Sequence, residues 1–553
     1  MDRNCDAFIR SNNTYDILIA RESLEISDDR AECIQNIGEK FVAEYFDRDE
    51  VPQLSIKTYG YSIIPKCFGL LDTLALETTG ILQLQNQPAL SLRGQGIFID
   101  TGISYELPCF RNADGSTRIR SIWDQSIPAG EKNTPQGFLY GTEYTQKEIN
   151  EALEQEHPRE LVPVTDEDGH GTMLASIACG SEDLQAGFTG AAPYAELLVV
   201  KLKPAKPYLK DFFYIPQEMP AYQENDIMAA IEYLEETARK LGRPLILCLG
   251  LGTNNGSHSG GSNLSELLDD IAGRWRRCAV VATGNEANAR HHFYGKSDGN
   301  LMVAVEVNVE QRMRGFYLEL WASAPELFVV AVRSPGGTLM PAQNVPGNSH
   351  QEQEFIFEGT RVEIDYAQVG RTRGDQLVFI RFENPAAGIW TLYVNPSTTI
   401  TGQFHIWLPM TGMLEKDVVF LRPDPDVTLT VPSSAKIPIG VGGMDQKSGI
   451  LYLDSGRGNT IASVVKPDFV APAVGVQAIG RLGNYVTLTG TSAASAIAAG
   501  ACAQIMEWGN SRGRRLLLNS VQIGNILIRG CERNPDVSYP NTAWGADDII
   551  VSS

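Results

Sequence analysis

The sequence lacks the features that mark nucleic-acid-binding, exported and membrane-spanning chains. Its 553 residues include 46 Lys and Arg against 67 Asp and Glu, which gives a net charge of −21 at pH 7. An acidic chain cannot neutralise many phosphates, so nucleic acid is excluded as a partner. The first residues place no apolar core after a basic region, and the apolar runs are too short for a membrane span. These absences predict synthesis in the cytoplasm without a signal peptide.

Cysteine is scarce and irregularly spaced. The nine cysteines lie singly between Cys5 and Cys531 and form no CxxC pair, which excludes the common zinc and redox motifs. An odd number of thiols without a signal peptide indicates a reducing compartment, so we expect reduced cysteines. No Asp-rich loop has the ligand spacing of a calcium site. We therefore expect the chain to need no cofactor and no metal.

Short apolar runs alternate with helical patterns between residues 94 and 296, which predicts a parallel sheet with crossover helices. Near residue 300 the pattern changes to successive strand-like runs with turn residues between them, and after about residue 430 it changes back. This order predicts an α/β domain interrupted by an antiparallel β domain, a sandwich or jelly roll.

A smaller unit precedes the α/β pattern. Residues 15–20 and 53–64 are strand-like, and a helical pattern lies near 30–46. Strand, helix and strand in so few residues predict a small α+β fold. The expected segments of the chain are 1–68, 69–297, 298–432 and 433–553.

Small residues dominate the stretch LTGTSAASAIAAG at 488–500. A helix of Ala, Ser and Gly can pack closely on every side. A hydroxyl in its first turn lies among free backbone N–H groups. Ser492 is therefore either an ordinary N-cap or a nucleophile at the positive end of a helix.

Three further polar residues follow predicted strands or begin a predicted helix, each beside a glycine. Asp100 ends GIFID, His170 begins an apolar helix in DEDGHGTMLASIACG, and Asn285 follows the strand in CAVVATGN. Alone, each has an ordinary interpretation as a turn or loop residue. Asp168 and His170 also suggest a metal site, but no second His stands at helical spacing. The carboxyl ends of parallel strands meet at one sheet edge, where catalytic groups gather.

Taken together and in this order, the motifs DTG, HGT, ATGN and GTSA resemble those of the subtilisin-like serine proteases. The resemblance implies that Ser492 is the nucleophile, that His170 takes its proton as the hydroxyl attacks a carbonyl, and that Asp100 orients the imidazole. The side-chain amide of Asn285 and the backbone N–H of Ser492 would bind the oxyanion.

Other stretches narrow the resemblance. Gly250, Leu251 and Gly252 match the segment that holds an extended substrate by strand pairing. GILQLQNQPALSLRGQG, GFLYGTEYTQKEINEAL and LGTNNGSHSG are similar to the Csp germination proteases of spore-forming clostridia. That resemblance implies a prodomain cleaved in cis that stays bound, an inserted jelly roll that rigidifies the protease, and packaging in the spore. The implied protein substrate is the proenzyme of a cortex-degrading hydrolase, and we expect the prodomain junction between residues 62 and 72.

Two alternatives stay open. Ile97, Phe98 and Ile99 alone separate GQG from DTG, where the family pattern has about six residues. A slip of one residue would turn Asp100 to the other face of the sheet. Because some germination relatives lack triad residues and act as receptors, a catalytically silent binding protein is the rival hypothesis. A general intracellular peptidase outside germination differs from the first hypothesis only in its substrate.

Overall fold

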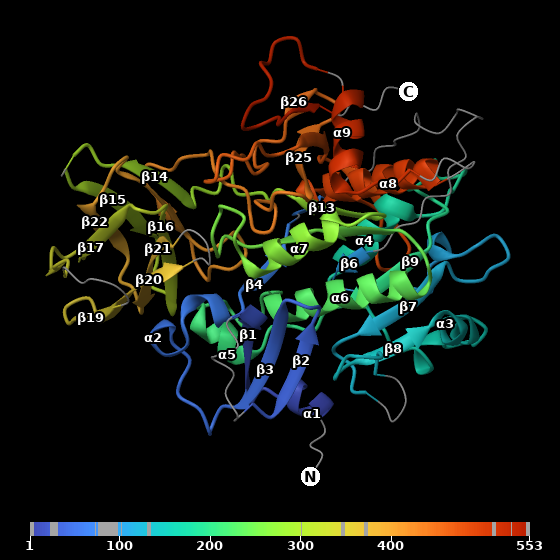
Figure 1. Ribbon diagram of the computed structural model, residues 1–553, viewed down its shortest axis with the longest axis horizontal. Helices are drawn as coiled ribbons and strands as arrows, with labels where there is room; N and C mark the ends of the chain where they lie inside the picture. Colours follow the sequence, from blue (N-terminus) through green and yellow to red (C-terminus); the bar gives the residue numbers. More distant parts are fainter. Residues whose placement is uncertain are drawn as a thin grey trace.

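The centre of the computed structural model is a largely parallel sheet with helices on both faces (Figure 1). The structure describes residues 5–22, 31–71, 73–75, 98–100, 102–129, 134–299, 301–343, 349–369, 374–510, 516–531 and 533–548. The strand order is β30 (Asp547–Asp548), β27 (Phe469–Pro472), β25 (Ile439–Asp445), β13 (Arg277–Ala282), β11 (Leu245–Leu249), β6 (Phe98–Asp100), β9 (Leu197–Lys201), β7 (Ile119–Asp124) and β8 (Thr142–Thr145). β8 is antiparallel to β7, and β26 (Ile450–Leu451) is antiparallel to β25.

Strand β11 shows why this sheet is covered on both sides. Its residues Leu245–Leu249 are all buried, with alternate side chains in two different apolar clusters. One cluster includes helices α4 (His170–Cys179) and α8 (Thr491–Asn510), and the other includes α6 (Glu224–Lys240) and α7 (Asn263–Gly273). Strands buried on both faces are continuous apolar runs, as the sequence predicts for a parallel sheet.

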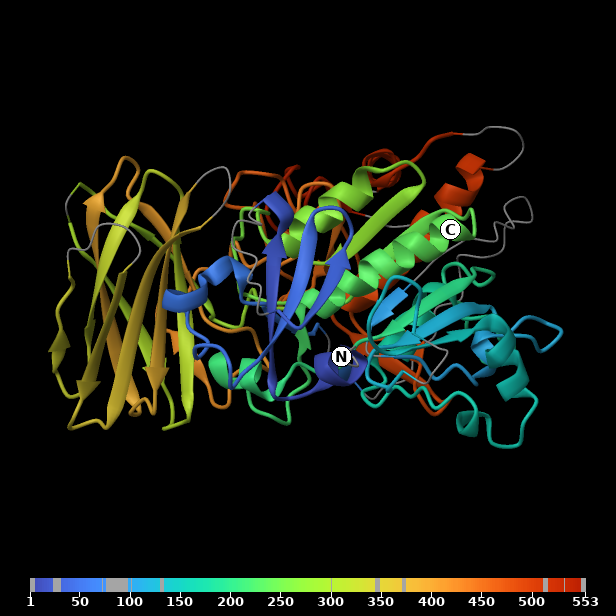
Figure 2. The same ribbon diagram turned by 60° about the horizontal axis from the view of Figure 1, so that its bottom comes forward.

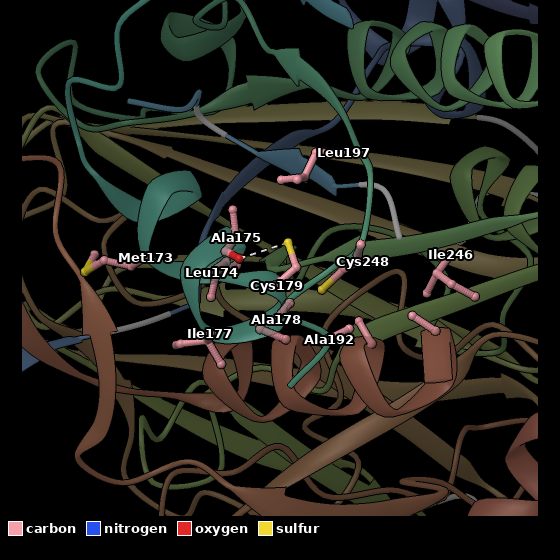
Figure 3. Packing of buried hydrophobic residues seen from close by; sticks show 14 of the residues in the cluster. Met173, Leu174, Ala175, Ile177, Ala178, Cys179, Ala192, Leu197, Ile246 and Cys248 are labelled. Atoms are coloured by element: carbon pink, nitrogen blue, oxygen red, sulfur yellow. Dashed lines mark hydrogen bonds between the residues drawn. The ribbon is translucent and has the colours of Figure 1, made fainter. Parts of the chain in front are cut away.

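The small residues of α8 allow it to pack closely on α4. Figure 3 shows Ile177 and Ala178 of α4 directed toward the neighbouring helix. A Cβ atom on Gly500 would lie 2.4 Å from the Ala191 Cβ and 2.8 Å from the Ala178 carbonyl oxygen, so no larger residue fits there. The Ala-rich run therefore serves a close helix contact that fixes the start of α8 beside the start of α4.

The remaining elements of the α/β part are short and connect the main layers. They are η3 (Pro108–Phe110), α3 (Gln146–Leu153), η4 (Pro158–Glu160), α5 (Pro207–Phe212), β10 (Tyr222–Gln223), β12 (Leu251–Gly252), β28 (Val476–Ile479), β29 (Tyr485–Thr489), β5 (Thr73–Ala75) and α9 (Ser520–Gly530). Within the described ranges, no helix combines the length and apolarity that crossing a bilayer requires.

Residues 5–71, called the N-terminal unit below, form a three-stranded antiparallel sheet that lies against α6 (Figures 1 and 2). Its elements are α1 (Cys5–Arg10), β1 (Thr14–Ala20), β2 (Cys33–Ile37), β3 (Phe41–Asp47), α2 (Ile56–Tyr59), η2 (Tyr61–Ile63) and β4 (Cys67–Leu70). The strand predicted at 15–20 is confirmed. The helix predicted near 30–46 is wrong, because Gly38, at φ 58°, turns this stretch into a hairpin of two strands.

Two further expectations for the N-terminal unit are corrected. The strand predicted over 53–64 is a helical turn, in which the Ser55 hydroxyl caps α2 by accepting from the Thr58 N–H, followed by a 3-10 turn. Cys5 and Cys33 form a disulfide with their Cα atoms 5.8 Å apart, so the expectation of reduced thiols fails for this pair. The other seven cysteines are free, as expected.

Residues 292–420, called the β insertion below, form two antiparallel sheets packed face to face. One sheet consists of β14 (His292–Lys296), β23 (Gln403–Trp407), β16 (Gly315–Ala322), β21 (Asp375–Glu383), β20 (Thr360–Val369) and β19 (Ser349–Phe355). The other consists of β18 (Leu339–Met340), β17 (Leu327–Arg333), β22 (Gly388–Thr398), β15 (Val303–Val309) and β24 (Val418–Phe420). Trp390 is buried inside the sandwich, whereas Trp407 is buried in an apolar cluster shared with the N-terminal unit.

Histidines gather where the β insertion meets the α/β part. His258 stacks on Trp407 with ring centroids 3.9 Å apart, and His292 lies at 4.8 Å from the same indole. The His292 Nε2 and His405 Nδ1 atoms are 2.9 Å apart. One of these nitrogens must donate and the other accept, so this contact needs at least one neutral imidazole.

The imidazole pair predicts that the protein loses stability in mild acid. Burial lowers the pKa of His405 to about 4, whereas an unfolded histidine titrates near 6.5. The stabilisation is fully present above pH 6.5 and is lost as the pH falls toward 4, by up to about 3 kcal/mol for this group. We expect the melting temperature of His405→Asn to fall less than that of the wild type between pH 7 and pH 4. His157→Asn, at an exposed site, is the control, and parallel pH profiles for all three proteins would contradict the prediction.

Candidate active site

Ser492 lies in the first turn of α8, fully buried from solvent. Gly490, at φ 151°, precedes the helix, and its N–H donates to the Ala473 carbonyl at 2.9 Å. No group in the described residues hydrogen-bonds to the Ser492 Oγ atom. An N-cap hydroxyl would accept from the helix N–H groups, so the structure gives Ser492 a hydroxyl that is not used as a cap.

His170 is the first residue of α4, and Asp166 fixes that helix start. Gly169, the N-cap, adopts φ 80°, a left-handed conformation that favours glycine. The Asp166 carboxylate accepts from the Gly169 N–H at 3.0 Å and from the Thr172 N–H at 2.8 Å. His170 is 1% exposed. Sequence reasoning missed Asp166, although a carboxylate ahead of a helix start is the usual signal of a cap.

Asp100 ends strand β6 at the carboxyl edge of the central sheet. Its backbone pairs with Lys201 of β9, and Ile99 pairs with Leu249 of β11, so the short strand joins both neighbours in parallel. The side chain of Asp100 lies outside the described part of the structure. Two residues later, a Cβ atom on Gly102 would lie 2.5 Å from the Thr165 carbonyl oxygen. This close approach holds the DTG segment against the segment that leads into His170.

The Asn285 side chain lies beside the start of α8 and is oriented by hydrogen bonds on both sides. Its Oδ1 accepts from the Thr491 N–H at 3.0 Å, and its Nδ2 donates to the Leu71 carbonyl oxygen at 2.7 Å. The Thr491 hydroxyl in turn accepts from the Gly284 N–H at 3.0 Å. Asn285 therefore presents an N–H donor next to Ser492, which is the arrangement that stabilises an oxyanion.

Gly250 is the point at which the predicted site residues meet. A Cβ atom there would lie 3.0 Å from the His170 Cε1 atom, 3.3 Å from the Ser492 Cβ atom and 2.5 Å from a Leu174 methyl. The imidazole and the serine therefore face the same small volume, and only glycine leaves that volume open. Asp168 is directed elsewhere, where its Oδ2 accepts from the Tyr222 hydroxyl at 3.1 Å, and the described residues contain no group of three metal-ligating side chains.

A segment of the N-terminal unit occupies the groove beside these residues. Strand β4 pairs antiparallel with β10 on one side and with β12 on the other. The Leu71 N–H donates to the Gly250 carbonyl at 3.3 Å, and the Leu71 side chain is 1% exposed. Gly250, Leu251 and Gly252 thus pair with an extended chain, in the way predicted for a substrate.

Two glycines leave room for the side chains of Leu71 and Thr430. A Cβ atom on Gly252 would lie 3.0 Å from a Leu71 methyl and 2.5 Å from the Thr430 hydroxyl oxygen. On Gly284 it would lie 2.4 Å from the Thr430 methyl. Sequence reasoning missed Thr430, because only long-range pairing brings it to this edge. Leu71 lies within the range 62–72 expected for the prodomain junction, although the sequence did not single it out.

The arrangement can perform acyl transfer. A serine hydroxyl is a weak nucleophile at neutral pH, and an imidazole facing it can remove its proton as it attacks a carbonyl carbon. The carbonyl oxygen bound by Asn285 would carry the developing negative charge, and a donor of this kind typically contributes about 3–4 kcal/mol to catalysis. Strand pairing along β12 supplies orientation of the polypeptide.

Comparisons with known proteins identify the family of the chain. The subtilase family model matches residues 97–360 and 422–541. The chain is similar to the solved Clostridium perfringens CspB protease, with a TM-score of 0.73, 27% identity, and coverage of 84% of this chain and 94% of that one. The mouse membrane-bound transcription factor site-1 protease is 33% identical over 129 residues, and the human protein is 32% identical over the same length.

The mouse and human matches are partial: they span 22% of this chain and 12% of the relatives' length. The family model, by contrast, spans more than half of the chain and both parts of the α/β fold. It also covers the positions of Asp100, His170, Asn285 and Ser492. The chain therefore belongs to the subtilase family.

Proposed function

We propose that this endopeptidase cuts its own chain after Leu71 and then cuts a protein substrate, the proenzyme of a spore cortex hydrolase, during germination. The observation that carries the first step is the contact between the Leu71 carbonyl and Asn285 Nδ2, at 2.7 Å. In this proposal Ser492, in the first turn of α8 beside Asn285, attacks the Leu71 carbonyl carbon, whose oxygen accepts from the Asn285 amide. The germination role rests on the likeness to the CspB protease and to the Csp proteases.

The proposed self-cleavage uses Ser492 as nucleophile and His170 as base and acid. The Ser492 oxygen bonds to the Leu71 carbonyl carbon while His170 accepts the hydroxyl proton. The bond between Leu71 and the following nitrogen breaks, and His170 returns the proton to that nitrogen. Water, activated by the same imidazole, then hydrolyses the acyl-serine, which leaves a carboxylate on Leu71 and restores the hydroxyl.

The N-terminal unit acts in this proposal as a prodomain. Its last strand, β4, lies in the groove and is followed by Leu71, the last residue before the proposed cut. After cleavage the same strand would still fill the groove, so a bound prodomain inhibits the processed enzyme until it leaves.

The experiment is the intact mass of the purified wild-type chain, followed over time and over a hundredfold range of protein concentration. We expect the 60.5 kDa chain to convert into pieces 1–71 and 72–553 at a rate independent of concentration, because a reaction in cis is first order. The processed protein is then incubated with the proenzyme of a cortex hydrolase, which should lose its own leader. A chain that stays whole would contradict self-cleavage, and an uncut proenzyme would contradict the germination role alone.

A further inference from the structure

One strand of the β insertion presents two different faces. In β16, Phe316, Leu318 and Leu320 pack inside the sandwich, while the alternate residues point out of it. Among the outward residues, Glu319 and Trp321 meet the N-terminal unit and the α/β part. A strand alternates its side chains between faces, so the position of Glu319 on this outer face is fixed by the pairing of β16 with β21 and β23.

The Glu319 carboxylate joins three parts of the chain. It accepts from the Tyr61 hydroxyl, with oxygen–oxygen distances of 2.8 and 2.9 Å. It also accepts from the Asn255 side-chain amide at 2.6 Å, the Gly256 N–H at 3.0 Å and the Trp321 indole N–H at 2.9 Å. Burial raises the pKa of Glu319, which these donors oppose. Four donors around a carboxylate that is 1% exposed make a built polar site in which each partner matters.

Tyr61 is held on its ring as well as its hydroxyl. Its ring contacts Trp321 edge to face, with centroids 5.7 Å apart, and Phe379 at 6.2 Å. The Lys66 ammonium lies 4.2 Å from the ring centroid and donates to the Tyr61 carbonyl at 2.8 Å. Both ribbon views place the neighbouring helix α2 beside the β insertion (Figures 1 and 2). The β insertion thus encloses a tyrosine with a hydrogen-bond acceptor at the bottom of the site.

This site and the active site are ten residues apart along one continuous segment. Tyr61 contacts Glu319, and Leu71 contacts Asn285. The residues that hold the two ends of this segment also lie close together in the sequence. Asn255 donates to Glu319, and it lies three residues after Gly252, which pairs with Gly69. Fixing both ends of a segment of set length leaves one register for the chain in the groove. A slip by one residue would move Leu71 out of its space and also break the tyrosine contact.

We propose that the β insertion forms a tyrosine subsite, built on Glu319, that selects the bond cut in this chain by holding a tyrosine ten residues before it. The inference rests on the proposed self-cleavage after Leu71. Glu319 is a positioning residue here: it acts through Tyr61 on the register of the segment and touches no reacting atom. The ligand class is a polypeptide with tyrosine at this spacing, and the occupant in the structure is the N-terminal unit itself.

The test compares two substitutions of the same kind, Tyr61→Phe and Tyr59→Phe. The first removes the hydroxyl that Glu319 accepts from. The second removes a hydroxyl that donates to the Pro52 carbonyl at 2.8 Å, within the N-terminal unit. Loss of a hydrogen bond to a buried charged group should slow self-cleavage about tenfold or more in Tyr61→Phe. Intact mass should also show added cuts beside the Leu71 bond, while Tyr59→Phe matches the wild type in rate and position.

A simple loss of stability would not change the position of the cut, so the position distinguishes a loss of register from a loss of stability. A second variant, Glu319→Gln, and the double variant with Tyr61→Phe test the contact itself, because a shared contact makes the two losses non-additive. Unchanged rate and a single cut in Tyr61→Phe, or fully additive losses in the double variant, would overturn the subsite while self-cleavage stands. A wild-type chain that stays whole would overturn the proposed function and this inference together.

Discussion

Replacing Ser492 with alanine is expected to leave the chain whole at 60.5 kDa under conditions in which the wild type is fully cut. Removal of a triad nucleophile lowers the chemical rate by about 10⁶-fold, because the oxyanion donor and substrate binding alone supply only the residual catalysis. The substitution removes one oxygen that has no hydrogen-bond partner in the described residues, so the fold should not change. Self-cleavage measured by intact mass, with melting temperature beside it, checks the prediction.

Ser495→Ala is the matched control for that variant. It lies in the same helix, also buried, and its hydroxyl donates to the Ser492 carbonyl at 2.8 Å. It should therefore cost some stability, at most about 1–2 kcal/mol for a hydrogen bond between neutral groups, and leave cleavage in place. The double variant of Ser492→Ala with His170→Ala should be no slower than Ser492→Ala alone, since the two groups act as one unit. Cleavage that persists in Ser492→Ala would assign the cut to another protease.

The predictable part of the site is the part carried by local sequence. Asp100, His170 and Asn285 each stand where a strand ends or a helix begins, and the structure places their backbones along one edge of the sheet as that pattern requires. Two glycines beside these residues also lie at this edge of the sheet. A Cβ atom on Gly250 or Gly102 would collide with neighbouring atoms there. The short strand before Asp100 suggests a slip in register, but its backbone pairs in parallel with both neighbouring strands.

The errors arise where tertiary contacts override local patterns. Residues 41–46 are buried on both faces of their strand, so they show no period of two and resemble a helix. The stretch 53–64 has the alternation of a strand, but Ser55 caps a helical turn instead. The position of Leu71 in the groove depends on pairing with residues about 150 and 180 places later, which no local pattern records.

The buried charges of the N-terminal unit could not be predicted from the sequence either, because a lone Asp in a strand usually faces solvent. Asp16 of β1 is instead fully buried. Its carboxylate lies 2.5 Å from the Lys206 ammonium and 3.8 Å from that of Lys203, and accepts from the Gln223 amide at 2.9 Å. Lys203 also pairs with Asp226 at 2.5 Å. This network ties the N-terminal unit to the α/β part through buried charges.

Replacing Asp16 with alanine is therefore expected to release piece 1–71 after self-cleavage. The change leaves a buried lysine charge uncompensated, and breaking a buried pair in this way costs about 3–5 kcal/mol. Converted to an equilibrium constant, that cost weakens the association of the two pieces by at least about a hundredfold. The wild-type pieces should coelute in size-exclusion chromatography at micromolar concentration, and the Asp16→Ala pieces should separate. Release should also raise peptidase activity, since the strand that fills the groove leaves with piece 1–71.

Lys40→Ala provides the control, because it breaks a contact between the same two parts at the surface. The Lys40 ammonium lies 3.2 Å from the Asp270 carboxylate, with the two side chains 50% and 30% exposed. Exposed pairs contribute about 0–1 kcal/mol, so the pieces of this variant should coelute as in the wild type. Coelution of the Asp16→Ala pieces would show that the apolar contacts and β4 pairing hold the N-terminal unit without the buried charges. Separation of the pieces in both variants would mean that the two parts associate weakly. The buried Asp16 pairs would then stabilise the association no more than the exposed Lys40–Asp270 pair does.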